Sequence, residues 1–204
     1  MEEEIYYKDY RILIKPDEFA DSPDDWSDDS LFLVYGHRSF SVNREGFDPE
    51  NIYSNPEEYS DFYIFPVEAY IHSGVRLSLF NGTKTCIFDS SISGYVIADK
   101  NEFTEDAAVK IAESLIEDWN NYLSGNVYGY IVEKPETIYS ISKEKFDILL
   151  FENDLANLEQ EFHVEHTWEE IDSCWGFYGD PEKSGCIDEA RRFIDYLINK
   201  DGKS

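Results

Sequence analysis

The chain has 204 residues, 42% hydrophobic and 16% aromatic, so it can bury a core and does not have the composition of an acidic disordered chain. It carries 44 Asp and Glu against 17 Lys and Arg, and its formal charge of −27 opposes binding to nucleic acid and to anionic membranes. No apolar run approaches the roughly 18 residues that span a bilayer, and the start MEEEIYYKDY is not a signal peptide. We therefore expect a cytoplasmic protein.

The first thirty residues hold eleven acidic and three basic residues. Pro23 and the density of Ser and Asp over residues 17–29 indicate a loop or a short capped helical turn. An apolar run at 31–35 predicts a strand that ends at Gly36. Residues 43–61 return to a loop-like composition rich in Pro and Asn.

A series of strands is predicted next. Residues 62–71 form a strand-like run, in which Pro66 removes one hydrogen-bond donor and indicates a sheet edge or a bulge. Residues 75–80 alternate between apolar and polar, and the following Asn-Gly pair predicts a hairpin whose partner strand covers 83–88. A further strand is expected at 94–98.

The clearest helix begins after Thr104, a suitable N-cap, and ends near Gly125. A strand at 127–132 is expected to end before Pro135. For 142–157 the pattern leaves a helix and a short buried strand both open.

Residues 168–172 read as a last strand, followed by an aromatic loop at 173–180. Apolar residues at helical spacing from Ile187 to Ile198 then predict a C-terminal helix. The fold class is thus α+β, an antiparallel sheet with one long central helix and a C-terminal helix. We expect a single domain over 1–204, with an acidic N-terminal region 1–30.

Motifs of catalysis are missing from the sequence. It has no GxSxG elbow, no P-loop, no GxGxxG after a strand and no DxDxDG loop, so we assign no catalytic residue and no cofactor. The odd number of cysteines, Cys86, Cys174 and Cys186, without a CxxC pair, indicates free thiols. His163 and His166 are spaced for one helical face, which leaves a metal site open, although isolated surface histidines are the simpler reading.

Four short strings stand in a familiar order: YIHSG at 70–74, FDS at 88–90 with GYV at 94–96, YLSGNVYGY at 122–130, and DSCWGFYG at 172–179. Together they resemble proteins of phages and conjugative elements, mostly of Gram-positive hosts, over about residues 62–180. The resemblance implies a mobile-element origin and brings no activity with it. It also implies that the acidic stretch 136–167 is an insertion. The chain departs from the pattern at Ile71, where Asp is usual, and at Ser91, where Gly is usual.

The charge and the resemblance favour one hypothesis, an acidic DNA mimic that inhibits a CRISPR or restriction nuclease by occupying its basic DNA-binding surface. Duplex DNA carries one charge per about 1.7 Å, so 27 charges correspond to about 46 Å of duplex. A compact chain of this length has a diameter of about 43 Å, which is a similar size. Trp26 and Tyr59 are candidate aromatic anchors. The candidate partner-binding residues are Asp21, Asp24, Asp25, Asp28, Asp29, Glu57, Glu58 and Asp61.

Three alternatives stay open. The acidic loops can be ordinary solvated surface. The chain can also be an enzyme or a small-molecule binder, which predicts that five residues converge on one pocket: His72, Asp89, Tyr122, Asp172 and Trp175. Finally, it can be a regulatory partner of the element's own replication or transfer proteins.

Overall fold

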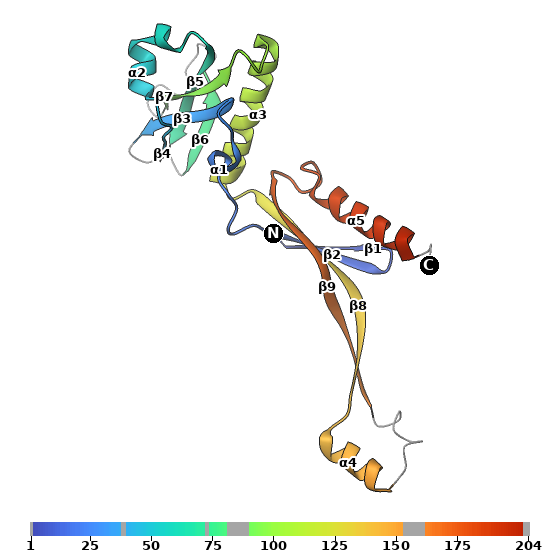
Figure 1. Cartoon of the computed structure of the whole chain (residues 1–204). Helices are drawn as coiled ribbons and strands as arrows, with labels where there is room; N and C mark the ends of the chain where they lie inside the picture. The colour runs from blue at the N-terminus through green and yellow to red at the C-terminus, as the bar shows by residue number, and fades with distance from the viewer. Residues whose placement is uncertain (1, 38–39, 72–73, 81–89, 153–161, 202–204) are drawn as a thin grey trace. The chain divides into compact units, whose positions relative to one another are not determined.

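The computed structural model describes residues 2–37, 40–71, 74–80, 90–152 and 162–201. Within them the chain forms two units, each built around its own antiparallel sheet (Figure 1). The five-stranded unit comprises Pro16–Tyr128 and Gly176–Ser184. The four-stranded unit comprises Met1–Lys15, Gly129–Trp175 and Gly185–Ser204. No helix in the described part of the chain is long and apolar enough to cross a membrane.

The sheet of the five-stranded unit has the strand order β4-β3-β7-β5-β6. Its strands are β3 (Leu31–His37), β4 (Phe40–Val42), β5 (Phe62–Ile71), β6 (Val75–Leu79) and β7 (Ser90–Asp99). Its helical segments are α1 (Pro23–Trp26), α2 (Pro49–Ser54), the 3-10 turn η1 (Pro56–Tyr59) and α3 (Glu105–Leu123).

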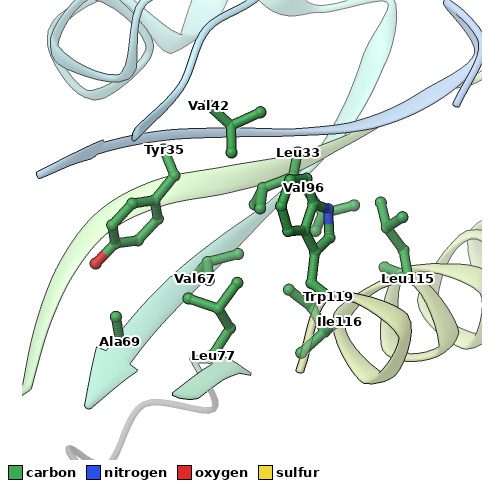
Figure 2. Packing of buried hydrophobic residues seen from close by; sticks show 11 residues of the cluster. Leu33, Tyr35, Val42, Val67, Ala69, Leu77, Val96, Leu115, Ile116 and Trp119 are labelled. Carbon is green, nitrogen blue, oxygen red and sulfur yellow. The ribbon is translucent and has the colours of Figure 1, made fainter. Parts of the chain in front are cut away.

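Helix α3 covers one face of this sheet. Thr104 precedes its first turn as the N-cap residue, and Gly125 follows it with a φ of 71°, a conformation that glycine adopts without strain. The buried face of α3 places Leu115, Ile116 and Trp119 against side chains of the sheet (Figure 2). Burial of this apolar surface holds the helix on the sheet.

The opposite face of the sheet is covered by α2 and η1. Phe32, Val34 and Ile97 of the sheet form a second buried cluster with Ile52 of α2 and Tyr59 of η1. Apolar side chains on both faces explain the continuous hydrophobic runs Leu31–Tyr35 of β3 and Tyr95–Ala98 of β7, unlike the alternation of a strand with one face in water.

The sheet of the four-stranded unit has the order β1-β2-β8-β9. Its elements are β1 (Glu3–Tyr7), β2 (Tyr10–Pro16), β8 (Val127–Ser140), α4 (Lys143–Glu152), β9 (His163–Tyr178) and α5 (Cys186–Asp201). Helix α5 buries Ile187, Ala190 and Ile194. Its Asp195 accepts hydrogen bonds from Tyr7 and Lys8 at the β1–β2 hairpin, at 3.1 and 2.6 Å, which ties the helix to this sheet.

The structure confirms the α+β class, the antiparallel pairing, the long helix and the C-terminal helix. Pro66 lies in β5, an interior strand, beside a register shift at Val67 and Glu68, so the bulge is confirmed and the edge is not. The short helical turn before β3 is present as α1, and residues 142–157 contain helix α4. The strand predicted at 83–88 lies outside the described residues.

Two boundary predictions are wrong. Strand β8 continues through Pro135 to Ser140. Strand β8 lies between β2 and β9, but it has 14 residues against the 7 of β2, so part of β8 has a partner strand on one side only. Proline is tolerated in such a part, where no neighbouring strand needs its missing N–H. Strand β9 runs from His163 through the predicted aromatic loop to Tyr178. The glycines of that segment led us to expect a loop, but aromatic residues also favour strands.

Candidate acidic binding surface

The sheet topology gathers acidic residues at one end of the five-stranded sheet. Strands β3 and β5 both begin where β7 ends, with Leu31 opposite Ala98 and Phe62 opposite Asp99. The backbone N–H of Asp99 donates to Ser30 O at 2.8 Å. The segments just before β3 and β5 and just after β7 therefore meet. We call this set the acidic sheet end: Asp24, Asp25, Asp28, Asp29, Glu57, Glu58, Asp61, Asp99 and Glu102.

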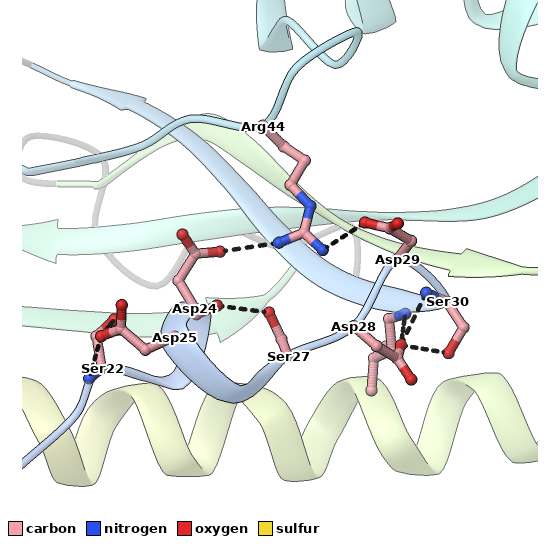
Figure 3. A network of polar contacts seen from close by, with 9 residues as sticks. Ser22, Asp24, Asp25, Ser27, Asp28, Asp29, Ser30 and Arg44 are labelled. Atoms are coloured by element: carbon pink, nitrogen blue, oxygen red, sulfur yellow. Dashed lines mark hydrogen bonds and ion pairs between the residues drawn. The ribbon is translucent and has the colours of Figure 1, made fainter.

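Arg44 joins two aspartates of this set (Figure 3). Its Nη2 donates to Asp29 Oδ1 at 2.8 Å, and its Nη1 lies 3.5 Å from Asp24 Oδ1. The guanidinium also stacks over the ring of Phe32, at 4.7 Å from its centroid. Asp24 is partly buried in this arrangement, whereas the Asp29 side chain is fully exposed. Arg44 therefore fixes both carboxylates and neutralises part of their charge.

Asp25 and Asp28 have local structural roles. Asp25 accepts from the hydroxyl and the backbone N–H of Ser22 at 2.8 and 2.9 Å, and so closes the capping box of α1. Asp28 accepts from the hydroxyl and the backbone N–H of Ser30 at 2.6 and 2.8 Å. The Ser22 and Ser30 hydroxyl bonds are the main reason that the pKa values of Asp25 and Asp28 lie below the ordinary value. Both side chains stay ionised and are held in one geometry.

The second predicted cluster surrounds η1 and the start of β5. Glu57, Glu58 and Asp61 are exposed, and Glu58 accepts from Asn51 Nδ2 at 3.2 Å. Lys100 lies beside them. Its backbone N–H donates to Asp61 O at 3.0 Å, and its ammonium donates to Ser60 O at 2.6 Å. The topology therefore brings seven of the eight predicted partner-binding residues to one sheet end.

Asp21 is the eighth predicted residue, and it lies before α1. Its backbone carbonyl accepts a hydrogen bond from Tyr178, while its side chain is exposed. The Tyr178 hydroxyl also accepts from Trp26 Nε1 at 3.1 Å, and the two rings pack edge to face. Trp26 remains half exposed beside the acidic residues, as an aromatic anchor requires.

Tyr59, the other proposed anchor, does not have this role. Its side chain is only 7% exposed and packs in the core under α2. Its hydroxyl accepts from Asn51 Nδ2 at 2.9 Å. The acidic residues next to Tyr59 in the sequence predict an exposed side chain, but η1 directs the ring inward against Phe47.

A cavity of about 490 Å³ opens beside Arg44. Its lining residues are Arg44, three phenylalanines and three acidic residues: Phe32, Phe47, Phe62, Asp29, Glu45 and Asp99. Sequence reasoning did not predict Asp99, because the residue belongs to the acidic sheet end only through strand pairing. Glu68 was also missed. Glu68 is only 2% exposed inside β5. In the sequence it stands between apolar residues, as a solvent-facing residue of a strand does, so the pattern gave no sign that it is buried.

The residues of the alternative pocket are not brought together in what the structure describes. His72 and Asp89 lie outside the described residues, and Tyr122 belongs to a different unit from Asp172 and Trp175. Asp172 accepts from the Tyr130 hydroxyl at 2.9 Å. The Trp175 ring packs on Gly129. Each of these two residues thus has a structural contact within the four-stranded unit.

His163 and His166 lie on strand β9 and not on a helix, so a spacing of three residues puts them on opposite faces. His166 Nδ1 lies 3.2 Å from the Thr137 hydroxyl. Among the described residues, no group of three or more His, Cys, Asp or Glu side chains is arranged to hold a metal ion. Cys174 and Cys186 are free thiols, exposed and buried respectively, and Cys86 lies outside the described residues.

The acidic N-terminal region 1–30 and the acidic stretch 136–167 are divided between the units. The stretch 136–167 and the first fifteen residues belong to the four-stranded unit, while the aspartates from 17 to 29 belong to the five-stranded unit. The five-stranded unit contains 24 acidic and 7 basic residues, and the four-stranded unit the remaining 20 and 10. The larger charge excess is thus on the unit that carries the acidic sheet end. No protein family, curated protein or solved structure matches this chain.

Proposed function

We propose that this chain is a binding protein without catalytic activity, whose acidic sheet end covers a Lys- and Arg-rich surface of a nucleic-acid-binding protein. The observation that carries the proposal is the fixation of Asp25, Asp28 and Asp29 by local bonds while their side chains remain exposed. Carboxylates held in one geometry lose little side-chain freedom on binding. They can therefore present charges at set positions to a basic partner.

The charge pattern also sets the mode of association. Nine carboxylates in the acidic sheet end exceed the two cations there, Arg44 and Lys100, so the local field attracts a basic groove. Such a field accelerates encounter and weakens as salt rises. The cavity beside Arg44 gives the acidic sheet end a concave binding site. Its phenylalanine rings and acidic lining residues suit an arginine side chain of the partner.

The partner class we propose is a nuclease of a bacterial defence system, of CRISPR or restriction type, inhibited in the cytoplasm by occupation of its DNA-binding surface. The resemblance of residues 62–180 to proteins of phages and conjugative elements is the reason for choosing this class. Inhibition would be stoichiometric and competitive with duplex DNA.

The test is capture of a partner on the immobilised chain from a lysate that contains such nucleases, at low salt, followed by elution with duplex DNA. Release of a nuclease by DNA would support the proposal. Retention in the presence of DNA, or capture of a replication or transfer protein of the element itself, would contradict it.

Charge reversal locates the surface. Glu57→Lys with Asp61→Lys changes two exposed acids of the acidic sheet end for which the described residues provide no side-chain hydrogen bond. Glu165→Lys with Glu170→Lys makes the same change in net charge on exposed positions of β9. The first pair should abolish capture and the second should preserve it. Equal loss with both pairs would show that net charge alone acts and would reject the acidic sheet end.

A further inference from the structure

Strand β6 is one of the two edge strands of the five-stranded sheet, and an amide side chain binds its outer edge. Asn120 of α3 accepts from Leu77 N–H at 2.7 Å and donates to Leu77 C=O at 2.9 Å. The carboxamide thus makes the same pair of bonds that a residue of a neighbouring strand would make. The edge of β6 therefore already accepts one peptide-like group.

The backbone groups on either side of Leu77 are available in the same direction. In an antiparallel pair, residues alternate between bonding to the partner strand and facing away from it. Phe80 N–H donates inward to Pro66 O at 2.8 Å, and Leu77 bonds outward to Asn120. The N–H and C=O of Val75 and Leu79 must then face outward too, and no described residue bonds to them there.

A groove runs along this edge, between β6 and α3. It encloses about 970 Å³, which is at the upper end of the range of ligand pockets. Apolar side chains, among them Leu77 and Ile116, line it together with Glu113 and Glu117 of α3. The two glutamates are exposed and four residues apart, so they share one helix face. Arg76 is also among the lining residues, but alternation directs its side chain to the other face of the sheet from Leu77.

We propose that this groove binds an extended peptide segment of a partner, which pairs with β6 as an additional strand and displaces Asn120. Strand addition is a common mode of peptide recognition: backbone bonds supply affinity and alternate side chains supply specificity. Glu113 and Glu117 select a peptide in which basic residues alternate with apolar ones. This inference does not depend on the proposed function, because it uses another edge of the five-stranded unit.

The direct test measures binding of a labelled, end-capped hexapeptide of alternating valine and lysine to the full chain by fluorescence anisotropy. Alternate N-methylation removes backbone donors without changing the charge, and should weaken binding at least about tenfold. Equal affinity for the methylated peptide would show that the acidic chain attracts lysine without strand pairing, and would overturn the proposal.

Two pairs of neutralising substitutions test the specificity. Glu113→Gln with Glu117→Gln should weaken binding of the valine and lysine peptide about tenfold, which corresponds to the loss of one or two charge contacts. Glu165→Gln with Glu170→Gln, the same change on β9, should leave the affinity within about twofold, a shift of less than about 0.5 kcal/mol. Equal effects of the two pairs would reject the groove as the binding site.

Asn120→Ala tests the displacement. The substitution removes the internal competitor of the peptide, so affinity should rise about tenfold if the peptide replaces the two amide bonds. Unchanged affinity in a variant that retains its helical circular dichroism would show that the peptide does not reach Leu77. If sedimentation shows that the chain alone dimerises and that the peptide dissociates the dimer, the occupant of β6 is a second copy and the proposal is wrong.

Discussion

The indole ring of Trp175 lies directly on the backbone of Gly129. A Cβ built on Gly129 would come within 2.2 Å of Trp175 Cε3 and within 2.7 Å of Cys174 O. The tryptophan ring therefore occupies the place of a side chain on β8, and glycine is required for steric reasons. This contact stabilises the four-stranded sheet where an isolated glycine would weaken it.

Gly129→Ala should destabilise the protein by about 1–3 kcal/mol, the usual cost of overpacking, despite the better strand propensity of alanine. Denaturant unfolding measures the change. Gly74→Ala is the matched control, since a Cβ there has open space, and it should be close to neutral. Combining Gly129→Ala with Trp175→Ala should cost less than the sum of the single changes. Simple additivity would contradict the contact.

Asp28 should make stability depend on acid pH. Its pKa is lowered, mainly by the Ser30 hydroxyl, so the folded state favours the ionised carboxylate. The stabilisation by Asp28 is complete above the pKa of an unfolded aspartate, about 3.9. It is lost as pH falls through the lower pKa that Asp28 has in the folded state. Asp28→Asn should flatten the stability profile in this range. Asp147→Asn, which removes a carboxylate at an exposed position of α4, serves as the comparison variant. An Asp28→Asn profile that matches the wild type would contradict this role.

Tyr130 should make the stability of the fold depend on alkaline pH. Burial first, and then the hydrogen bond to Asp172, raises the pKa of its hydroxyl well above the ordinary value. The contribution of Tyr130 to the free energy of unfolding is complete below the pKa of an unfolded tyrosine, about 10. It is lost as pH rises toward the higher pKa of the folded state. In a spectrophotometric titration, Tyr130→Phe should remove one tyrosine that ionises only on unfolding. It should also cost about 1 kcal/mol at neutral pH. Ionisation of Tyr130 with the exposed tyrosines would contradict its burial.

The two described cysteines should differ in reactivity. Cys186 is fully buried, and burial raises the pKa of its thiol to about 12. Cys174 is exposed. Iodoacetamide at pH 8 should therefore alkylate Cys174 in the native protein and reach Cys186 only after unfolding, because the thiolate is the nucleophile. Peptide mass spectrometry separates the sites. Equal labelling of both thiols under native conditions would contradict the packing of α5.

Patterns that depend on neighbouring residues in the chain predicted the fold best. The spacing of apolar residues and the N-cap Thr104 located α3, and the run at 62–71 matched β5 at both ends. The β1–β2 hairpin was missed, because its two-residue turn is Lys8-Asp9, with Lys8 at a φ of 56°, in place of the Asn-Gly pair that marks such turns.

The candidate site was predicted less fully, because it depends on strand pairing. Acidic density indicated Asp28 and Glu57, but nothing local shows that Asp99 joins them through the β3–β7 and β5–β7 pairings. Local density also could not distinguish exposed Trp26 from buried Tyr59. Pairing register and side-chain direction are properties of the folded sheet, so a single sequence does not reveal them.

The order in which segments of the four-stranded unit occur in the chain determines its order of assembly during synthesis. The β1–β2 hairpin leaves the ribosome before β8 and β9, which complete its sheet and follow the stretch from Asp17 to Asn126. Ile12 and Ile14 of β2 are buried in the completed unit. That intervening stretch supplies all five strands of the other unit. The five-stranded sheet can therefore form before the partner strands of the hairpin have been synthesised. Because domains form as they emerge, the β1–β2 hairpin stays incomplete, with Ile12 and Ile14 not yet buried, until β8 has been synthesised.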